Sequence, residues 1–336
     1  MTLPITLTPG LQESLRSYLR RTLAANGIGL GERTRWFPEV SWPTVCVAPT
    51  QTELKVLSAA TRQAPSSLLH ASILGFRAAM PMLALLNPAT SRDVRNLTRR
   101  VWLWPVHSQC CPQCMSRHPD IWLRDWQSPY VLGCPTHERL LLTRCRACSV
   151  ILSDGHSHGF DPTCPRDNRQ QLTPHDLRAL GRIIAALSGS SVRCSIGPIG
   201  PSDYLDALRS LSALLSHLDH YSRVRGHGQA RPLVAPPELA STRRALLVRA
   251  DQLLRLTPYQ AAAHLRLRID QVRGSYGRRS CARDHSTPTP VTEPILRLAL
   301  SGAVSLRWAR IDSVPRTIAV AAARSTSTTS QGRVGP

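Results

Sequence analysis

Apolar residues recur at three- and four-residue intervals along much of the chain, which is the period of an amphipathic helix. The first of these stripes consists of Leu11, Leu15, Leu19 and Leu23. Asn26-Gly27 follows it and is typical of a helix C-terminus. The pattern predicts helices over residues 11–26, 52–62, 66–80, 238–256 and 258–276.

Two further stripes lie between residues 177 and 218. One contains Leu177, Leu180, Ile184 and Leu187, and the other contains Tyr204, Leu208, Leu211, Leu215 and Leu218. Residues 189–201 and 226–237 carry Gly and Pro and are expected to be linkers. Helical periodicity is lost between residues 101 and 169, where seven of the ten cysteines lie.

This distribution predicts a mainly α-helical protein with small zinc-ribbon β elements. We expect an N-terminal helical region over residues 1–100, a tandem zinc-ribbon region over 101–170 and a second helical region over 171–283. Residues 284–336 are rich in Pro, Ser and Thr, so a partly disordered tail is expected there.

Metal ligands are predicted by the spacing of the cysteines. Two residues separate Cys111 from Cys114, and the same gap separates Cys134 from His137. Such a gap lets both side chains of a tight turn reach one ion, and zinc takes four ligands from two such turns. The four residues predict a structural Cys3His zinc site, and the neighbouring Cys110 is expected to be a bystander.

A second zinc site is expected from four further residues, Cys145, Cys148, Cys164 and Asp167. Asp167 is in register for the fourth position, but a carboxylate is a less usual structural ligand. His156 and His158 are the alternative fourth ligands. A second ribbon that has lost its metal and is held by packing is the remaining alternative.

Charge indicates a polyanionic partner. The chain carries 42 Lys and Arg against 21 Asp and Glu, a formal net charge of +21, and Lys55 is its only lysine. A GC-rich genome would explain arginine in place of lysine, but it does not explain the twofold excess of base over acid. We therefore expect double-stranded DNA as a partner.

Residues 257–276 are expected to contain a helix-turn-helix, with an ordinary helical hairpin as the alternative. Thr257 suits an N-cap and Pro258 the first helical position. A turn before Ile269 would bury Leu265 and Leu267 between the two helices. The expected DNA contacts are Arg266, Arg268, Gln271, Arg273, Arg278 and Arg279.

Several classes of protein are not expected. No apolar run approaches the roughly 18 residues that cross a bilayer, and the first residues lack the order of a signal peptide. A cytoplasmic location is therefore expected. No paired acids, Gly-rich phosphate loop or Ser/His/Asp arrangement predicts catalysis, so we expect no enzyme.

Together these residues resemble the TniQ family. The segment from Glu13 to Leu19, with Asn26-Gly27, is similar to the opening helix of that family. A second segment of the chain is similar to the zinc-ribbon core of the family. This segment contains Cys111-Pro-Gln-Cys114, Trp126, Cys134-Pro-Thr-His137, Leu140-Leu141 and Cys145-Arg-Ala-Cys148. The resemblance extends over residues 9–170. Asp167 stands where the family usually has a cysteine, and Arg266 where a helix-turn-helix often has glycine.

The resemblance implies a non-catalytic target selector for transposition, related to TnsD. Such proteins bind target DNA or dock on an RNA-guided effector, and they recruit an AAA+ ATPase regulator that brings the transposase. Apart from the resemblance, a homodimer formed through the C-terminal helices is a further expectation. The alternative interpretation is a zinc-containing DNA-binding regulator that is not tied to a transposon.

Overall fold

The computed structural model describes residues 2–85, 101–104, 107–144, 151–152, 170–223 and 240–276. Helices dominate these residues and the strands are short, as the sequence predicted. No described helix is both long and apolar enough to cross a membrane. The linker expected at residues 226–237 and the tail expected at 284–336 lie outside the described residues.

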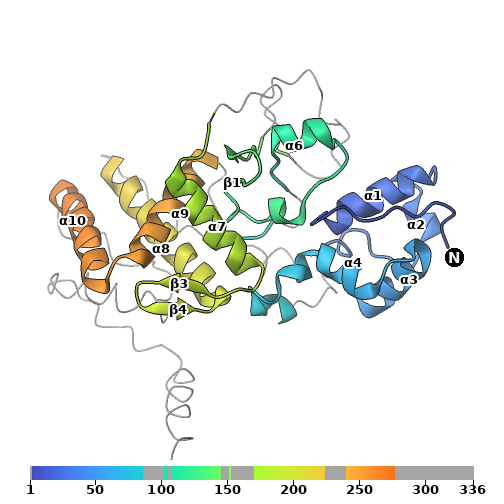
Figure 1. The fold of residues 1–336 in the computed structure, drawn as a ribbon, viewed down its shortest axis with the longest axis horizontal. Helices are drawn as coiled ribbons and strands as arrows, with labels where there is room; N and C mark the ends of the chain where they lie inside the picture. Colours follow the sequence, from blue (N-terminus) through green and yellow to red (C-terminus); the bar gives the residue numbers. More distant parts are fainter. Residues whose placement is uncertain are drawn as a thin grey trace, which may run out of the picture.

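The N-terminal helices pack around a core of their own. They are α1 (Leu15–Ala25), α2 (Arg33–Trp36), α3 (Gln51–Thr61) and α4 (Pro65–Ala71), drawn in blue in Figure 1. α1 begins where the Ser14 hydroxyl accepts a hydrogen bond from the backbone N–H of Ser17. α3 begins with a capping box, because the side chains of Thr50 and Glu53 each accept from the other's backbone N–H.

The first helix is shorter than the predicted range of 11–26. Gln12 has a φ of 57°, in the left-handed region, and Leu11 before it is 91% exposed. Leu11 therefore does not share the buried stripe of Leu15, Leu19 and Leu23, which lies on α1.

The single helix predicted over residues 66–80 is wrong in its second half. α4 ends at Ala71 because Ser72 is extended, and the Ser72 hydroxyl then caps a 3-10 turn, η1 (Ile73–Phe76). A second 3-10 turn, η2, spans Pro81–Leu85. Gly75 allows this path, because a Cβ there would lie 2.1 Å from the His70 carbonyl oxygen and 2.5 Å from Nη1 of Arg124.

The middle of the chain, from residue 101 to residue 144, has little regular structure where it is described. Its elements are α6 (Pro112–Arg117), the 3-10 turn η3 (Arg124–Gln127), β1 (Gly133–Cys134) and β2 (Arg139–Leu140). The two strands are antiparallel, with Gly133 opposite Leu140 and Cys134 opposite Arg139.

Long helices form the C-terminal part of the described chain. They are α7 (Pro174–Leu187), α8 (Pro201–Arg223), α9 (Ala240–Arg255) and α10 (Pro258–Tyr276). α8 packs against α7, α9 and α10. The linker predicted over residues 189–201 instead contains an antiparallel hairpin of β3 (Val192–Cys194) and β4 (Gly197–Ile199). Gly197, the first residue after the turn, has a φ of 112°, which side chains rarely tolerate.

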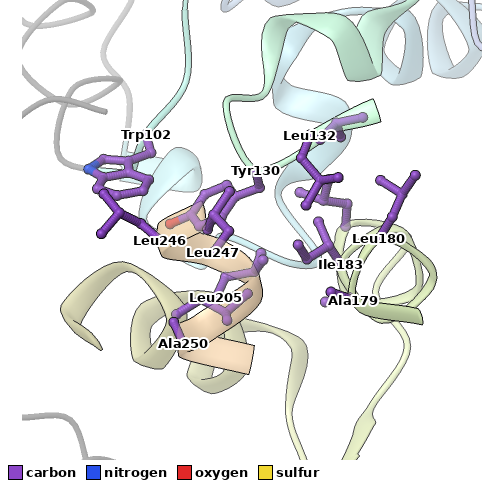
Figure 2. Packing of buried hydrophobic residues seen from close by; sticks show 14 of the residues in the cluster. Trp102, Tyr130, Leu132, Ala179, Leu180, Ile183, Leu205, Leu246, Leu247 and Ala250 are labelled. Carbon is purple, nitrogen blue, oxygen red and sulfur yellow. The ribbon is translucent and has the colours of Figure 1, made fainter. Parts of the chain in front are cut away.

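The middle of the chain and the C-terminal helices share one hydrophobic core. Figure 2 shows Trp102 and Tyr130 packed toward Leu246 and Leu247 of α9. Tyr130 is 1% exposed, and its ring centroid lies 5.6 Å from that of Trp102. The region boundaries expected at residues 100 and 170 lie at the edges of undescribed stretches, so they stay a prediction.

The turn predicted inside residues 257–276 is wrong. α10 continues from Pro258 to Tyr276 through the residues that were expected to turn. No Gly or Pro lies between Tyr259 and Arg273, and arginine is a good helix former, so nothing interrupts the helix. Leu265 is 1% exposed, as expected, but Leu267 is 65% exposed.

The predicted start of this helix is confirmed. The Thr257 hydroxyl accepts a hydrogen bond from the backbone N–H of Gln260, and α10 begins at Pro258. Two residues, Leu256 and Thr257, join it to the end of α9.

Candidate metal centre and its surroundings

The four ligands predicted for the first site lie in two local turns. Cys111 is the N-cap of α6, and Cys114 lies in the first turn of that helix. Cys134 ends β1, and His137 lies in the turn that leads to β2. Glu138 completes that turn with a φ of 51°. Each turn thus supplies two ligands, and the fold brings the two turns together.

Distances among the ligand atoms fit a tetrahedral ion. Nδ1 of His137 lies 3.4 Å from Sγ of Cys111, 3.3 Å from Sγ of Cys114 and 3.4 Å from Sγ of Cys134. The sulfur atoms of Cys114 and Cys134 are 3.7 Å apart. Tetrahedral zinc, with bonds of about 2.3 Å to sulfur and about 2.0 Å to nitrogen, would separate its ligand atoms by about 3.5–3.8 Å. This cluster can therefore hold a metal ion.

The thiols of the cluster differ in their pKa shifts. Hydrogen bonds from the Cys111 and Cys114 thiols lower the pKa of Cys134, and the backbone N–H of His137 acts in the same direction. The corresponding contacts with Cys111 and Cys134 raise the pKa of Cys114. The protein by itself thus favours one thiolate in the cluster, whereas a bound divalent cation would deprotonate every coordinating thiol.

A buried polar contact links Gln109, two residues before the first ligand pair, to α9. Nε2 of Gln109 donates to the carbonyls of Ser128 at 2.9 Å and Val131 at 2.6 Å. Oε1 of Gln109 accepts a hydrogen bond from Nη2 of Arg243 at 2.8 Å. The Arg243 guanidinium lies 4.9 Å above the Trp104 ring, and burial lowers the pKa of Arg243 to about 9. Arginine at position 243 carries no local sequence signal for this role, so the residue could not be predicted from its neighbours in the chain.

A second link joins α1 to the segment that follows α6. The backbone N–H of Ser14 donates to the Trp122 carbonyl at 2.8 Å, and the N–H of Arg124 donates to the Gln12 carbonyl at 2.8 Å. The Ser17 hydroxyl accepts from the N–H of Trp122 at 3.0 Å. The N-terminal helices are thus fixed to the part of the chain that carries the first ligand pair.

The second predicted site lies outside the described residues. This applies to Cys145, Cys148, Cys164 and Asp167 and to the alternatives His156 and His158. The site stays a prediction. Cys110 is fully buried and exchanges backbone hydrogen bonds with Leu142, both at 2.9 Å. It is not part of the metal cluster.

The predicted DNA contacts lie on α10 or beyond it. Arg268 forms an ion pair at 2.8 Å with Asp219 of α8, and the other oxygen of Asp219 pairs with Arg249 of α9 at 2.8 Å. Arg268 therefore helps to hold three helices together. Arg266 is partly exposed on α10. The backbone of Gln271 and Arg273 lies in α10, and Arg278 and Arg279 lie outside the described residues.

The described residues form a mainly helical protein that contains a Cys3His cluster able to hold a metal ion. Residues 4–141 match the sequence model of the TniQ family, so this part of the chain is similar to that family. The match begins before α1 and ends after β2, and it includes all four ligands of the cluster. TniQ proteins are associated with DNA transposition. No curated protein and no solved structure matches the chain.

Proposed function

We propose that the chain is a non-catalytic adaptor that selects target sites for DNA transposition. The TniQ match over residues 4–141 carries this proposal. In it, the adaptor binds duplex DNA, recruits an AAA+ regulator, and the regulator brings the transposase. The net charge of +21 supports a polyanionic partner, because binding to DNA is dominated by neutralisation of its phosphates.

The ion in the Cys3His cluster is Zn2+ in this proposal, and its role is structural. Thiolate and imidazole ligands suit zinc, and four protein ligands leave no position for a reactive water. The ion would hold α6 against the β1–β2 turn, where little regular structure exists to do so. A second zinc ion bound by Cys145, Cys148, Cys164 and Asp167 belongs to the same proposal.

Targeted insertion in cells tests the adaptor function. Deletion of the gene should abolish insertion at the preferred sites while the transposase remains active at random sites. Unchanged insertion frequency and site choice would refute target selection and would favour a DNA-binding regulator outside transposition.

Duplex binding by the purified, metal-quantified protein separates two modes of targeting. Binding is titrated with salt on random DNA and on the flanks of the encoding locus. A steep salt slope with preference for one sequence would mean that the protein reads its target directly. Weak and indiscriminate binding would mean that an RNA-guided effector supplies the specificity.

A further inference from the structure

The β3–β4 hairpin ends against the junction between α9 and α10. The backbone N–H and the hydroxyl of Ser195 both donate to the carbonyl of Leu254, each at 3.2 Å. Leu254 is the last residue but one of α9, and α10 begins at Pro258. The turn of the hairpin therefore lies beside the point where the chain passes from α9 to α10 (Figure 1).

Three exposed residues lie next to this contact along the chain. Arg193 lies on β3, Ile196 lies in the turn of the hairpin, and Arg255 ends α9. Arg193 is exposed in the middle of β3, two residues before Ser195, which lies in the turn with Ile196. Each of the three residues is one or two positions in the chain from Ser195 or Leu254, which hydrogen-bond to each other. Two positions of extended backbone span about 7 Å. We call these three residues the hairpin–junction surface; its Ile196 is 54% exposed.

The arginines of this surface differ from most of their neighbours in having no acidic partner. Ion pairs join Arg182 to Asp251, Arg244 to Asp176, and both Arg249 and Arg268 to Asp219. Within the part of the chain that the structure describes, no carboxylate pairs with Arg193 or Arg255. Their positive charge is therefore available to an anion outside the molecule.

We propose that the hairpin–junction surface binds the phosphate backbone of duplex DNA. Arg193 and Arg255 each contact one phosphate, and Ile196 packs against the sugars between them. The Ser195–Leu254 hydrogen bonds fix the two arginines relative to each other, so the contact positions the duplex without reading its sequence. This inference rests on the proposed DNA-binding function. It places the DNA contact at this surface and not at Arg268, which is paired with Asp219.

The test is the salt dependence of duplex binding by the full-length protein. Each phosphate contact contributes about −0.9 to the slope of log K against log salt, so R193Q/R255Q should reduce the slope by about 1.8. The control R35Q/K55Q removes the same charge from exposed positions of α2 and α3 and should leave the slope unchanged. I196S should weaken binding without changing the slope.

Two outcomes separate this inference from the function on which it rests. If R193Q/R255Q and R35Q/K55Q have equal slopes while the wild type binds with a steep slope, the proposed DNA contact at this surface is wrong and the adaptor function stands. If the wild type binds no duplex, the DNA-binding function itself fails. R193K/R255K keeps both charges and should keep the wild-type slope, which distinguishes loss of charge from loss of fold.

Discussion

Three sulfur atoms and one nitrogen atom lie together at the candidate metal centre, where they could hold a cation. Nδ1 of His137 lies within 3.4 Å of three sulfur atoms. Hydrogen bonds from Cys111 and Cys114 lower the pKa of the Cys134 thiol. Each ligand is therefore required individually, since loss of one leaves three donors and an incomplete tetrahedron.

Replacing one ligand should remove one zinc ion per chain. We expect Cys134→Ser to lose that ion relative to the wild type and to lose fixed structure around α6 and the β1–β2 turn. Binding of structural zinc contributes about 10–16 kcal/mol to folding in small zinc fingers, which is more than this short region could replace by packing. Metal content is measured by mass spectrometry, and local order by amide hydrogen exchange.

The control for this prediction is Cys110→Ala. Cys110 is as deeply buried as the ligands but lies outside the cluster, so this variant should keep the wild-type metal content. Equal metal content in Cys134→Ser and the wild type would rule out the assignment of Cys134 as a ligand.

Spacing in the sequence was sufficient to find the four ligands, because each pair is formed by one local turn. It could not find the contact between Gln109 and Arg243. These two residues are 134 positions apart, and their contact depends on how α9 packs against the middle of the chain. A buried arginine in a basic stretch has the same local sequence pattern as an exposed one, so burial alone distinguishes Arg243 from its neighbours.

At the scale of elements, two glycines have opposite roles. Gly75 lies in η1, where a Cβ would lie 2.1 Å from the His70 carbonyl oxygen. Gly181 lies in the middle of α7, where a Cβ would meet nothing within 4 Å. The first glycine is required by close packing, and the second costs helix stability without a packing reason.

Alanine at these positions should change stability in opposite directions. Gly75→Ala forces backbone or Arg124 to move, which should lower the free energy of unfolding by about 1–3 kcal/mol. Gly181→Ala should raise it by about 0.5–1 kcal/mol, because alanine is the better helix former. Urea denaturation of both variants measures this, and a shift of the same sign in both would contradict the packing around η1.

Helix starts were easier to predict than helix interruptions. Thr257 and Pro258 act through groups next to them in the chain, so their pattern was sufficient to place the start of α10. The break after α4 depends on Ser72 and on Arg124, which approaches from a distant segment. Conversely, the turn predicted near Arg266 required a helix breaker that the sequence does not contain.

At the scale of the whole molecule, the segment over residues 107–144, which carries the four candidate ligands, contacts both the N-terminal helices and α9. Tyr130 and Leu247 belong to one hydrophobic core, which contains residues from the middle of the chain and from α9. Arg243 and Gln109 add a polar contact within it. The packing of α9 therefore depends on the segment that leads into the first ligand pair.

Loss of the Arg243 contact should weaken this connection. Arg243→Met leaves Oε1 of Gln109 buried without its donor, which should lower the free energy of unfolding by about 1–3 kcal/mol. Hydrogen exchange should rise both in α9 and around Gln109. Arg255→Met, on the exposed end of the same helix, should change stability by less than about 0.5 kcal/mol. Equal effects of the two variants would argue against coupling through Arg243.

The link between α1 and the segment after α6 also sets the order of events during synthesis. The Ser17 hydroxyl and the Trp122 amide that it binds are 105 residues apart. A ribosome that adds about 5–20 residues per second needs roughly 5–20 s to make that stretch. Throughout that interval α1 has left or is leaving the exit tunnel, and its partner segment does not yet exist. Docking of α1 is therefore a late step, and the nascent N-terminal helices must stay free of aggregation until the metal-binding segment emerges.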